Sequence, residues 1–270
     1  MSVGRNALGG LASLVVALFA AAAPRAQDDG PRVYQLAPEG AQTVTVFWVV
    51  KRGDETPEPG SFIPGAEIDT DVVVFRYART LDLGGRAFTP FAILPVGRVR
   101  ATDAPESSGL GDAQLGATLG LVGAPALSRE AYAAFEARFG VSVLARVFLP
   151  TGAYDAATPV NLGSNRAAFQ LGLPTYLASG TSFRDPALTS LEVLPTLTFY
   201  QDNDQPFGGG HSAKDPLFTV EAHLTRNFGA RTWASADLLY RNGGKTRTEG
   251  GVDAGRPAAA SPFPSLSGLR

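Results

Sequence analysis

The chain has 270 residues and a formal net charge of −2, from 25 acidic and 23 basic side chains. This balance argues against a nucleic-acid partner, because binding a phosphate backbone requires clustered Lys and Arg. Hydrophobic residues make up 44% of the sequence, so an intrinsically disordered chain is not expected. The sequence contains no cysteine, which excludes disulfides, thiol catalysis and cysteine-ligated metals.

The first 26 residues have the anatomy of a secretory signal peptide. Arg5 supplies a positive start, an apolar stretch covers 7–23, and small residues continue to Ala26. An N-terminal membrane anchor is the alternative, although the most apolar part, 14–23, is short for a spanning helix of about 20 residues. No later run approaches that length, so we expect a periplasmic protein, a secreted protein or an outer-membrane barrel.

Beyond the signal, apolar and polar residues alternate with a period of two, which is typical of strands with one apolar face. In 110–122, for example, Leu115, Leu119 and Leu121 alternate with Gln114 and Thr118. Many of the segments reach the ~9–11 residues that a tilted strand needs to cross a bilayer. Nine segments are strand-like: 43–50, 69–81, 85–99, 110–122, 140–149, 166–177, 188–201, 217–228 and 231–241.

The connections alternate between long and short, as in outer-membrane barrels. The odd-numbered ones are long and polar: 51–68, 100–109, 150–165 and 202–215. Two of the even-numbered ones are tight turns, at 84–85 and 229–230. In the fourth, Ser128 is expected to cap a short helix over 128–138 that ends before Gly140, with an early start of the fifth strand as the alternative.

Two groups of residues qualify this interpretation. Four prolines fall inside expected strands, where each removes a ladder donor and requires a bulge or a strand end: Pro90, Pro95, Pro174 and Pro195. Four aromatic residues lie toward strand ends, where they fit either the membrane–water interface or ordinary packing: Trp48, Tyr200, Trp233 and Tyr240.

The expected fold is therefore an antiparallel up-and-down outer-membrane β-barrel, with a signal peptide at 1–26, a barrel domain at 27–250 and an irregular tail at 251–270. Nine strands do not close as an even-numbered bacterial barrel. We therefore keep the alternative that the chain is an incomplete barrel of about twelve strands whose tail is truncated or frameshifted. Closure would direct one set of polar side chains into the lumen: Asp112, Gln114, Arg146, Gln170, Glu192, Glu221, His223 and Asp237.

No motif predicts catalysis, a cofactor or a metal. Glu221 and His223 share a strand face, but two ligands do not make a metal site. The acidic run 202–204 is expected to be a solvated turn rather than a calcium site, and the glycines at 208–210 lack the Lys-Ser/Thr of a phosphate loop. No Ser-His-Asp arrangement is recognisable, so we expect a protein that is not an enzyme.

Several stretches resemble the outer-membrane transporter family associated with the meta-pathway of phenol degradation. They are GLGD at 109–112, LPTGAYD at 149–155, NLGSNR at 161–166, LEVLPTLTFYQDND at 191–204, KDPLFTVEAHL at 214–224 and WASADLLYRNGGKT at 233–246. The resemblance covers roughly residues 33–250 and depends on the order and spacing of the stretches. It implies an outer-membrane barrel that passes aromatic or other hydrophobic compounds.

Three functional hypotheses follow. The first is a passive channel or uptake protein in the bacterial outer membrane, with membrane lipid and a small-molecule solute as its partners. The second is a structural or adhesive barrel without transport. The third is a soluble periplasmic β-protein or an outer-membrane enzyme, for which His211 and His223 are the only candidate histidines.

Overall fold

The computed structural model describes residues 13–16, 29–59, 61, 63–249 and 265–267. Apart from β1 (Ser13–Val16) and β16 (Ser265–Ser267), the expected signal peptide and the expected tail lie outside the described residues. β1 pairs with β2 in parallel, and β16 pairs with β14 in antiparallel orientation. The expected domain boundaries at residues 26 and 250 therefore remain predictions.

The expected strands are present as one antiparallel sheet in which each long strand pairs with its neighbours in sequence. A break divides the sixth strand in two, β9 and β10. The long strands are β2 (Gln42–Gly53), β3 (Ile68–Arg79), β5 (Arg86–Ala101), β7 (Gln114–Val122), β8 (Phe139–Phe148), β9 (Ala168–Gly172) with β10 (Thr175–Ser179), β11 (Thr189–Tyr200), β13 (Leu217–Asn227) and β14 (Trp233–Gly243). The shorter strands are β4 (Leu81–Leu83), β6 (Ser107–Leu110), β12 (Ser212–Lys214) and β15 (Thr246–Thr248).

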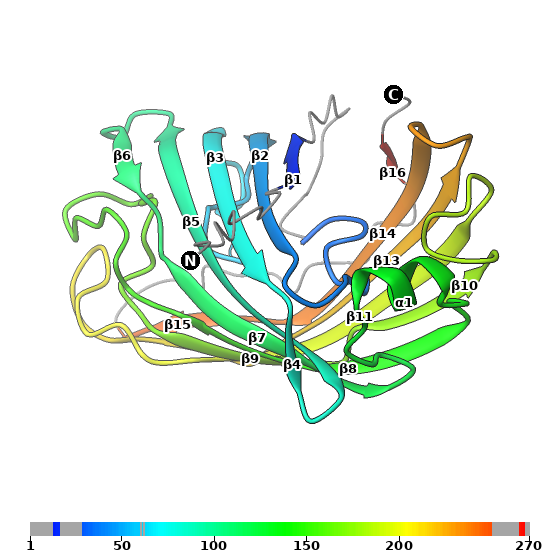
Figure 1. The fold of residues 1–270 in the computed structure, drawn as a ribbon. Helices are drawn as coiled ribbons and strands as arrows, with labels where there is room; N and C mark the ends of the chain where they lie inside the picture. The colour runs from blue at the N-terminus through cyan, green and yellow to red at the C-terminus, as the bar shows by residue number, and fades with distance from the viewer. Residues whose placement is uncertain (1–12, 17–28, 60, 62, 250–264, 268–270) are drawn as a thin grey trace, which may run out of the picture.

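The sheet curves around an interior in a single layer (Figure 1). The barrel-type fold predicted from the alternation is therefore confirmed. Within the described residues, β1 and β16 are the ends of the strand order, and no strand pairing joins β2 to β14.

Each of the four strand prolines lies where one of its two ladders is interrupted, as the sequence predicted. Pro90 lies between the part of β5 that pairs with β3 and the part that pairs with β4. Pro95 lies between the parts of the same strand that pair with β6 and β7. Pro174 separates β9 from β10, and Pro195 lies opposite that break in β11. The interruptions accommodate the missing N–H donors without leaving the sheet.

The expected helix is present but shorter than predicted, because α1 covers only Arg129–Ala134. The Ser128 hydroxyl caps it by accepting a hydrogen bond from the Ala131 backbone N–H at 3.2 Å. The chain becomes extended at Phe135, so residues 135–138 approach β8 as irregular backbone. We define the end of the barrel that carries α1 and the tight turns as the short-turn end, and the opposite end as the long-loop end.

Each end of the barrel contains an apolar cluster. At the short-turn end, the Phe183 ring stacks on Tyr132 of α1 with ring centroids 5.6 Å apart, and Leu36 packs into the same cluster. At the long-loop end, Ile68 and Leu162 belong to a cluster that joins β3 to the 150–165 loop. No helix among the described residues has the length and apolar character needed to cross a membrane.

Candidate functional site

The two faces of the sheet have opposite chemistry. In β11, Leu191, Leu197 and Phe199 are exposed on the outer face, whereas Glu192 and Thr196 are buried on the inner face. The same inversion occurs in β13, where Phe218 and Leu224 are exposed while their polar neighbours are buried. Successive strand residues point to opposite faces, so the alternation in sequence becomes an apolar exterior around a polar interior.

The structure places the eight predicted lumen residues in three settings. Arg146, Glu192 and Glu221 are buried and contact the segment that precedes β2. Gln114, Gln170, His223 and Asp237 lie on the inner face and bond to side chains of neighbouring strands. Asp112 lies apart from them, just before β7, where it bonds to loops at the long-loop end.

Residues 29–41 enter the barrel as irregular chain, and we call 29–36 the inner segment. Asp29 anchors it, because the carboxylate pairs with Arg146 of β8 and accepts a hydrogen bond from the Tyr34 hydroxyl at 2.6 Å. The Asp29 backbone N–H donates to Glu221 of β13 at 3.0 Å. The segment is therefore held from two sides of the barrel by groups that are buried and paired.

Arg32 provides the second anchor. Its backbone N–H donates to Glu192 at 2.9 Å, and its guanidinium donates to Asn227 at 2.7 Å. The guanidinium also lies 4.4 Å from the centre of the Trp233 ring, a cation–π contact. Arg32 has a φ of +66°, an uncommon conformation for a residue other than glycine, so these contacts hold the backbone in a conformation it would otherwise disfavour.

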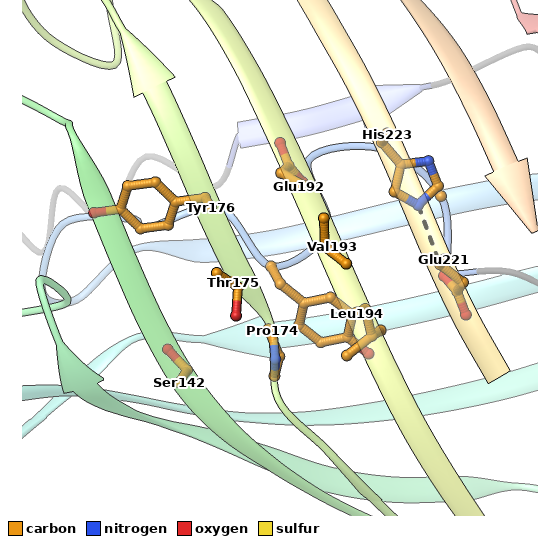
Figure 2. A pocket seen from close by; sticks show the side chains of 11 residues that line it. Ser142, Pro174, Thr175, Tyr176, Glu192, Val193, Leu194, Glu221 and His223 are labelled. Atoms are coloured by element: carbon orange, nitrogen blue, oxygen red, sulfur yellow. Dashed lines mark ion pairs between the residues drawn. The ribbon is translucent and has the colours of Figure 1, made fainter. Parts of the chain in front are cut away.

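A small pocket remains between the inner segment and the wall (Figure 2). Its lining includes Tyr34 and the break at Pro174, together with Glu192, Glu221 and His223. The cavity volume is about 20 Å³. A single water molecule needs at least ~10–15 Å³, so the pocket in this conformation has room for little more than one.

His223 belongs to a buried polar group in the same region. Its Nδ1 lies 2.8 Å from the Asp237 carboxylate, and its Nε2 lies 3.7 Å from Glu221. In the part of the chain that the structure describes, no three His, Asp or Glu side chains are grouped so that they could hold a metal ion.

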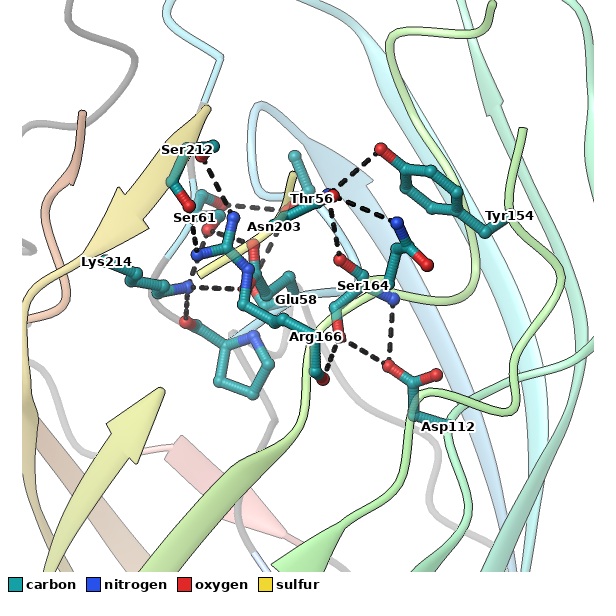
Figure 3. Close-up of polar contacts among 12 residues, drawn as sticks. Thr56, Glu58, Ser61, Asp112, Tyr154, Ser164, Arg166, Asn203, Ser212 and Lys214 are labelled. Atoms are coloured by element: carbon teal, nitrogen blue, oxygen red, sulfur yellow. Dashed lines mark hydrogen bonds and ion pairs between the residues drawn. The ribbon is translucent and has the colours of Figure 1, made fainter. Parts of the chain in front are cut away.

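Asp112 joins the loops at the long-loop end (Figure 3). Its carboxylate accepts hydrogen bonds from the Gly152 N–H at 2.9 Å and from the Ser164 N–H at 2.8 Å. These residues come from the stretches GLGD, LPTG and NLGS of the sequence, which therefore meet in space. A Cβ on Gly152 would lie 2.6 Å from the Gly163 Cα, so these two parts of the 150–165 loop approach more closely than a side chain at position 152 permits.

The first long loop folds across the same end. Glu58 pairs with Arg166 at 3.2 Å and with Lys214 at 3.4 Å (Figure 3). Lys214 also donates to the Pro59 carbonyl at 2.7 Å, and burial lowers the pKa of its ammonium group to about 8. Nearby, but exposed, His211 lies between Asp204 and Asp202, and its hydrogen bond to Asp204 is the main reason that its pKa is raised.

The sequence did not reveal the inner segment, and it left two alternatives open for the four aromatic residues near strand ends. Trp48 and Tyr240 are exposed on the outer face, in agreement with an interfacial position. Trp233 instead contacts Arg32, and the Tyr200 ring lies 4.6 Å below the Lys214 ammonium group, so both face the interior. One sequence signal could have indicated the inner segment. The stretch DDGPRVYQL at 28–36, shortly after the expected signal peptide, combines charged residues with an aromatic one.

With this geometry established, comparisons with known proteins decide the family. Residues 39–262 match the family described as "Putative MetA-pathway of phenol degradation". The chain belongs to this family. A crystal structure of the COG4313 outer membrane channel from Pseudomonas putida F1 has a similar fold, with a TM-score of 0.64 and 20% sequence identity over 83% of this chain and 80% of that one. None of the curated proteins matches the chain.

Membership in this family confirms the resemblance that the sequence motifs indicated. The solved channel supports the β-barrel fold of this chain, and at this identity it shows the fold alone.

Proposed function

We propose that this family member is a passive outer-membrane channel that takes up small molecules, with compact aromatic or other hydrophobic compounds as the preferred class. The proposal places it in the bacterial outer membrane, after export by the N-terminal signal peptide. Membrane lipid and a diffusing solute would be its partners, and no catalytic step is required.

The observation that carries the proposal is that the sheet has its apolar face outside and its polar face inside. Large apolar side chains such as Trp48, Leu115 and Leu177 are about half exposed on the outer face. In water such a surface would be a severe aggregation hazard, whereas lipid accommodates it. This exposed belt also argues against a soluble periplasmic protein.

Two features of the interior support a small, compact solute. The inner segment lies inside the barrel and bonds to Glu221 and Glu192 of its inner wall, so a solute has to pass beside it or displace it. Beside it, Phe91, Ile93, Leu144 and Leu194 form an apolar cluster on the otherwise polar inner face. These side chains are buried in the present conformation, so an aromatic or hydrophobic solute would contact them once the inner segment, whose Tyr34 packs on them, has shifted.

A structural barrel without transport is the second candidate, and the filled interior is the observation that favours it. An enzyme has less support, because both histidines have carboxylate partners. His211 contacts Asp202 and Asp204, and His223 contacts Glu221 and Asp237. Neither contact resembles the serine–histidine pair that a hydrolase at the barrel rim would need.

The deciding experiment compares the full chain with a variant that lacks residues 29–36. Both are purified from the outer-membrane fraction, checked for heat-modifiable migration on gels, and inserted into planar bilayers. We expect a small ion current for the full chain, a larger one for the deletion variant, and partial block of both by benzyl alcohol but not by glycerol. Absence of current from both folded proteins would favour the structural barrel, and release by osmotic shock would contradict the membrane location.

A further inference from the structure

Four cationic side chains converge inside the barrel near the long-loop end. Lys51 lies at the end of β2, Arg166 directly before β9, Lys214 in β12, and Arg241 near the end of β14. Each of them is no more than 6% exposed, so water contributes little to their solvation. Buried charges are retained in proteins only when other charges or hydrogen bonds compensate them.

Two carboxylates from the first long loop share these four cations. Glu55 pairs with Lys51 at 3.3 Å and with Arg241 at 2.6 Å. Glu58 bridges the other two cations, Arg166 and Lys214. In the described part of the chain, the cluster therefore carries more positive than negative charge, and each carboxylate divides its oxygens between two partners.

The Arg241 guanidinium has a buried donor without an acceptor among the described residues. Arg241 Nη1 donates to Glu55, whereas the buried Nη2 has no hydrogen-bond partner among the described residues. Tyr200 brings a hydroxyl into the same place, since its ring lies under Lys214 and its oxygen is within the electrostatic reach of Arg166 and Arg241. Guanidinium and phenol donors around excess positive charge form the pattern that binds oxyanions.

We infer that this cluster is a binding site for a small oxyanion, a carboxylate or a phosphate, held by Arg241 and Tyr200 beside the positive charge of Lys214, beneath the first long loop. The site follows from the buried charge and the unpaired donor. This inference adds a charged class of ligand to the proposed function. A role of the bound anion in uptake rests on the proposed function, whereas binding of the anion does not. Binding itself is measured on the folded protein without any transport.

The test is equilibrium binding to the full-length protein in a non-ionic detergent at pH 7, by calorimetry. The probes are benzoate, acetate and inorganic phosphate as oxyanions, with phenol as a neutral ring and chloride as a simple anion. We expect saturable binding of at least one oxyanion, and its identity separates a carboxylate site from a phosphate site. Equal binding of phenol or chloride would overturn the assignment, as would absence of binding up to 10 mM, roughly the concentration at which only weak ion pairing remains.

Variants test whether the anion occupies this place. Arg241→Gln should weaken binding by at least about tenfold, because it removes a charge-assisted donor. Arg247→Gln is the matched control, since Arg247 lies in the neighbouring strand β15 but is exposed and paired with Asp215. Glu55→Gln should strengthen binding, because it removes the negative charge that competes with the anion for Arg241.

The two variants are expected to change the affinity in opposite directions, which a general folding defect would not do. Heat-modifiable migration on gels reports folding separately. If Arg241→Gln fails to fold, the Glu55→Gln comparison still decides. Equal affinities of wild type, Arg241→Gln and Glu55→Gln would overturn the site. Such a result would leave the channel proposal intact, because conductance is measured in a different assay.

Discussion

Asp112 and Ser164 connect two loops that are 52 positions apart in sequence, because the carboxylate accepts hydrogen bonds from both the Ser164 N–H at 2.8 Å and its hydroxyl at 2.6 Å. The same carboxylate holds the Gly152 N–H. One side chain thereby satisfies three donors of the 150–165 loop that would otherwise need water, at the end of the barrel where Glu58 and Lys214 meet (Figure 3).

Replacing this carboxylate should loosen the long-loop end. We expect Asp112→Ala to lower the free energy of unfolding by about 1–3 kcal/mol, because partly buried donors lose a charged acceptor. Urea titration of the protein in lipid vesicles measures the change, and limited proteolysis shows whether cleavage moves into 150–165. Asp54→Ala is the control, since Asp54 is an exposed loop carboxylate at the same end, and equal losses for the two variants would contradict the role of Asp112.

Weakening one anchor of the inner segment should raise the conductance. Arg32→Ala removes the hydrogen bonds to Thr225 and Asn227 and the contact with Trp233. A loss of about 1.5–3 kcal/mol corresponds to a rise of roughly ten- to hundredfold in the population with a displaced segment. Single-channel recording gives the open probability directly.

Arg231→Ala serves as the comparison for this experiment, because Arg231 is exposed in the turn between β13 and β14, near the residues that Arg32 contacts. We expect it to conduct like the wild type. An Arg32→Ala protein that folds and shows the open probability of Arg231→Ala would mean that the inner segment does not limit the current.

His211 should titrate above the ordinary histidine value. Its hydrogen bond to Asp204 and the nearby Asp202 charge favour the protonated ring, so the pKa is raised from 6.5. A raised folded-state pKa contributes stability below pH 6.5 that is lost as the pH rises through the folded value. NMR titration measures this readily because the chain has only two histidines. Asp204→Asn should lower the midpoint, and an unchanged midpoint would disprove the contact.

Lys214 should change the stability with pH in the direction opposite to that of His211. Its folded-state pKa of about 8 lies below the ordinary 10.5, so between these values the unfolded chain binds a proton that the folded chain does not. Stability should therefore rise with pH between about 8 and 10.5. Other groups also titrate in this window, so the measurement is the difference between wild type and Lys214→Gln, whose curve should be flatter. Parallel curves would show that Lys214 is solvated in the folded protein.

The sequence by itself determined the strands, their order and the two faces of the sheet. Alternation with a period of two is a local property, and β13 shows it directly, since Phe218 and Leu224 point outward while Glu221 and His223 point inward. Loop lengths predicted which end would carry the large loops, and the four prolines marked the interruptions of the ladders. The helix start at Ser128 was also readable from its cap, whereas its early end at Phe135 was not.

Only the tertiary structure decided how the interior is filled. The inner segment has no periodicity, and its contacts join Asp29 to Arg146 and Arg32 to Glu192 across more than a hundred positions. The same is true of Arg241, whose partner Glu55 comes from the opposite end of the chain. Pairing of this kind depends on how the curved sheet brings distant strands together, and no local pattern of residues encodes that distance.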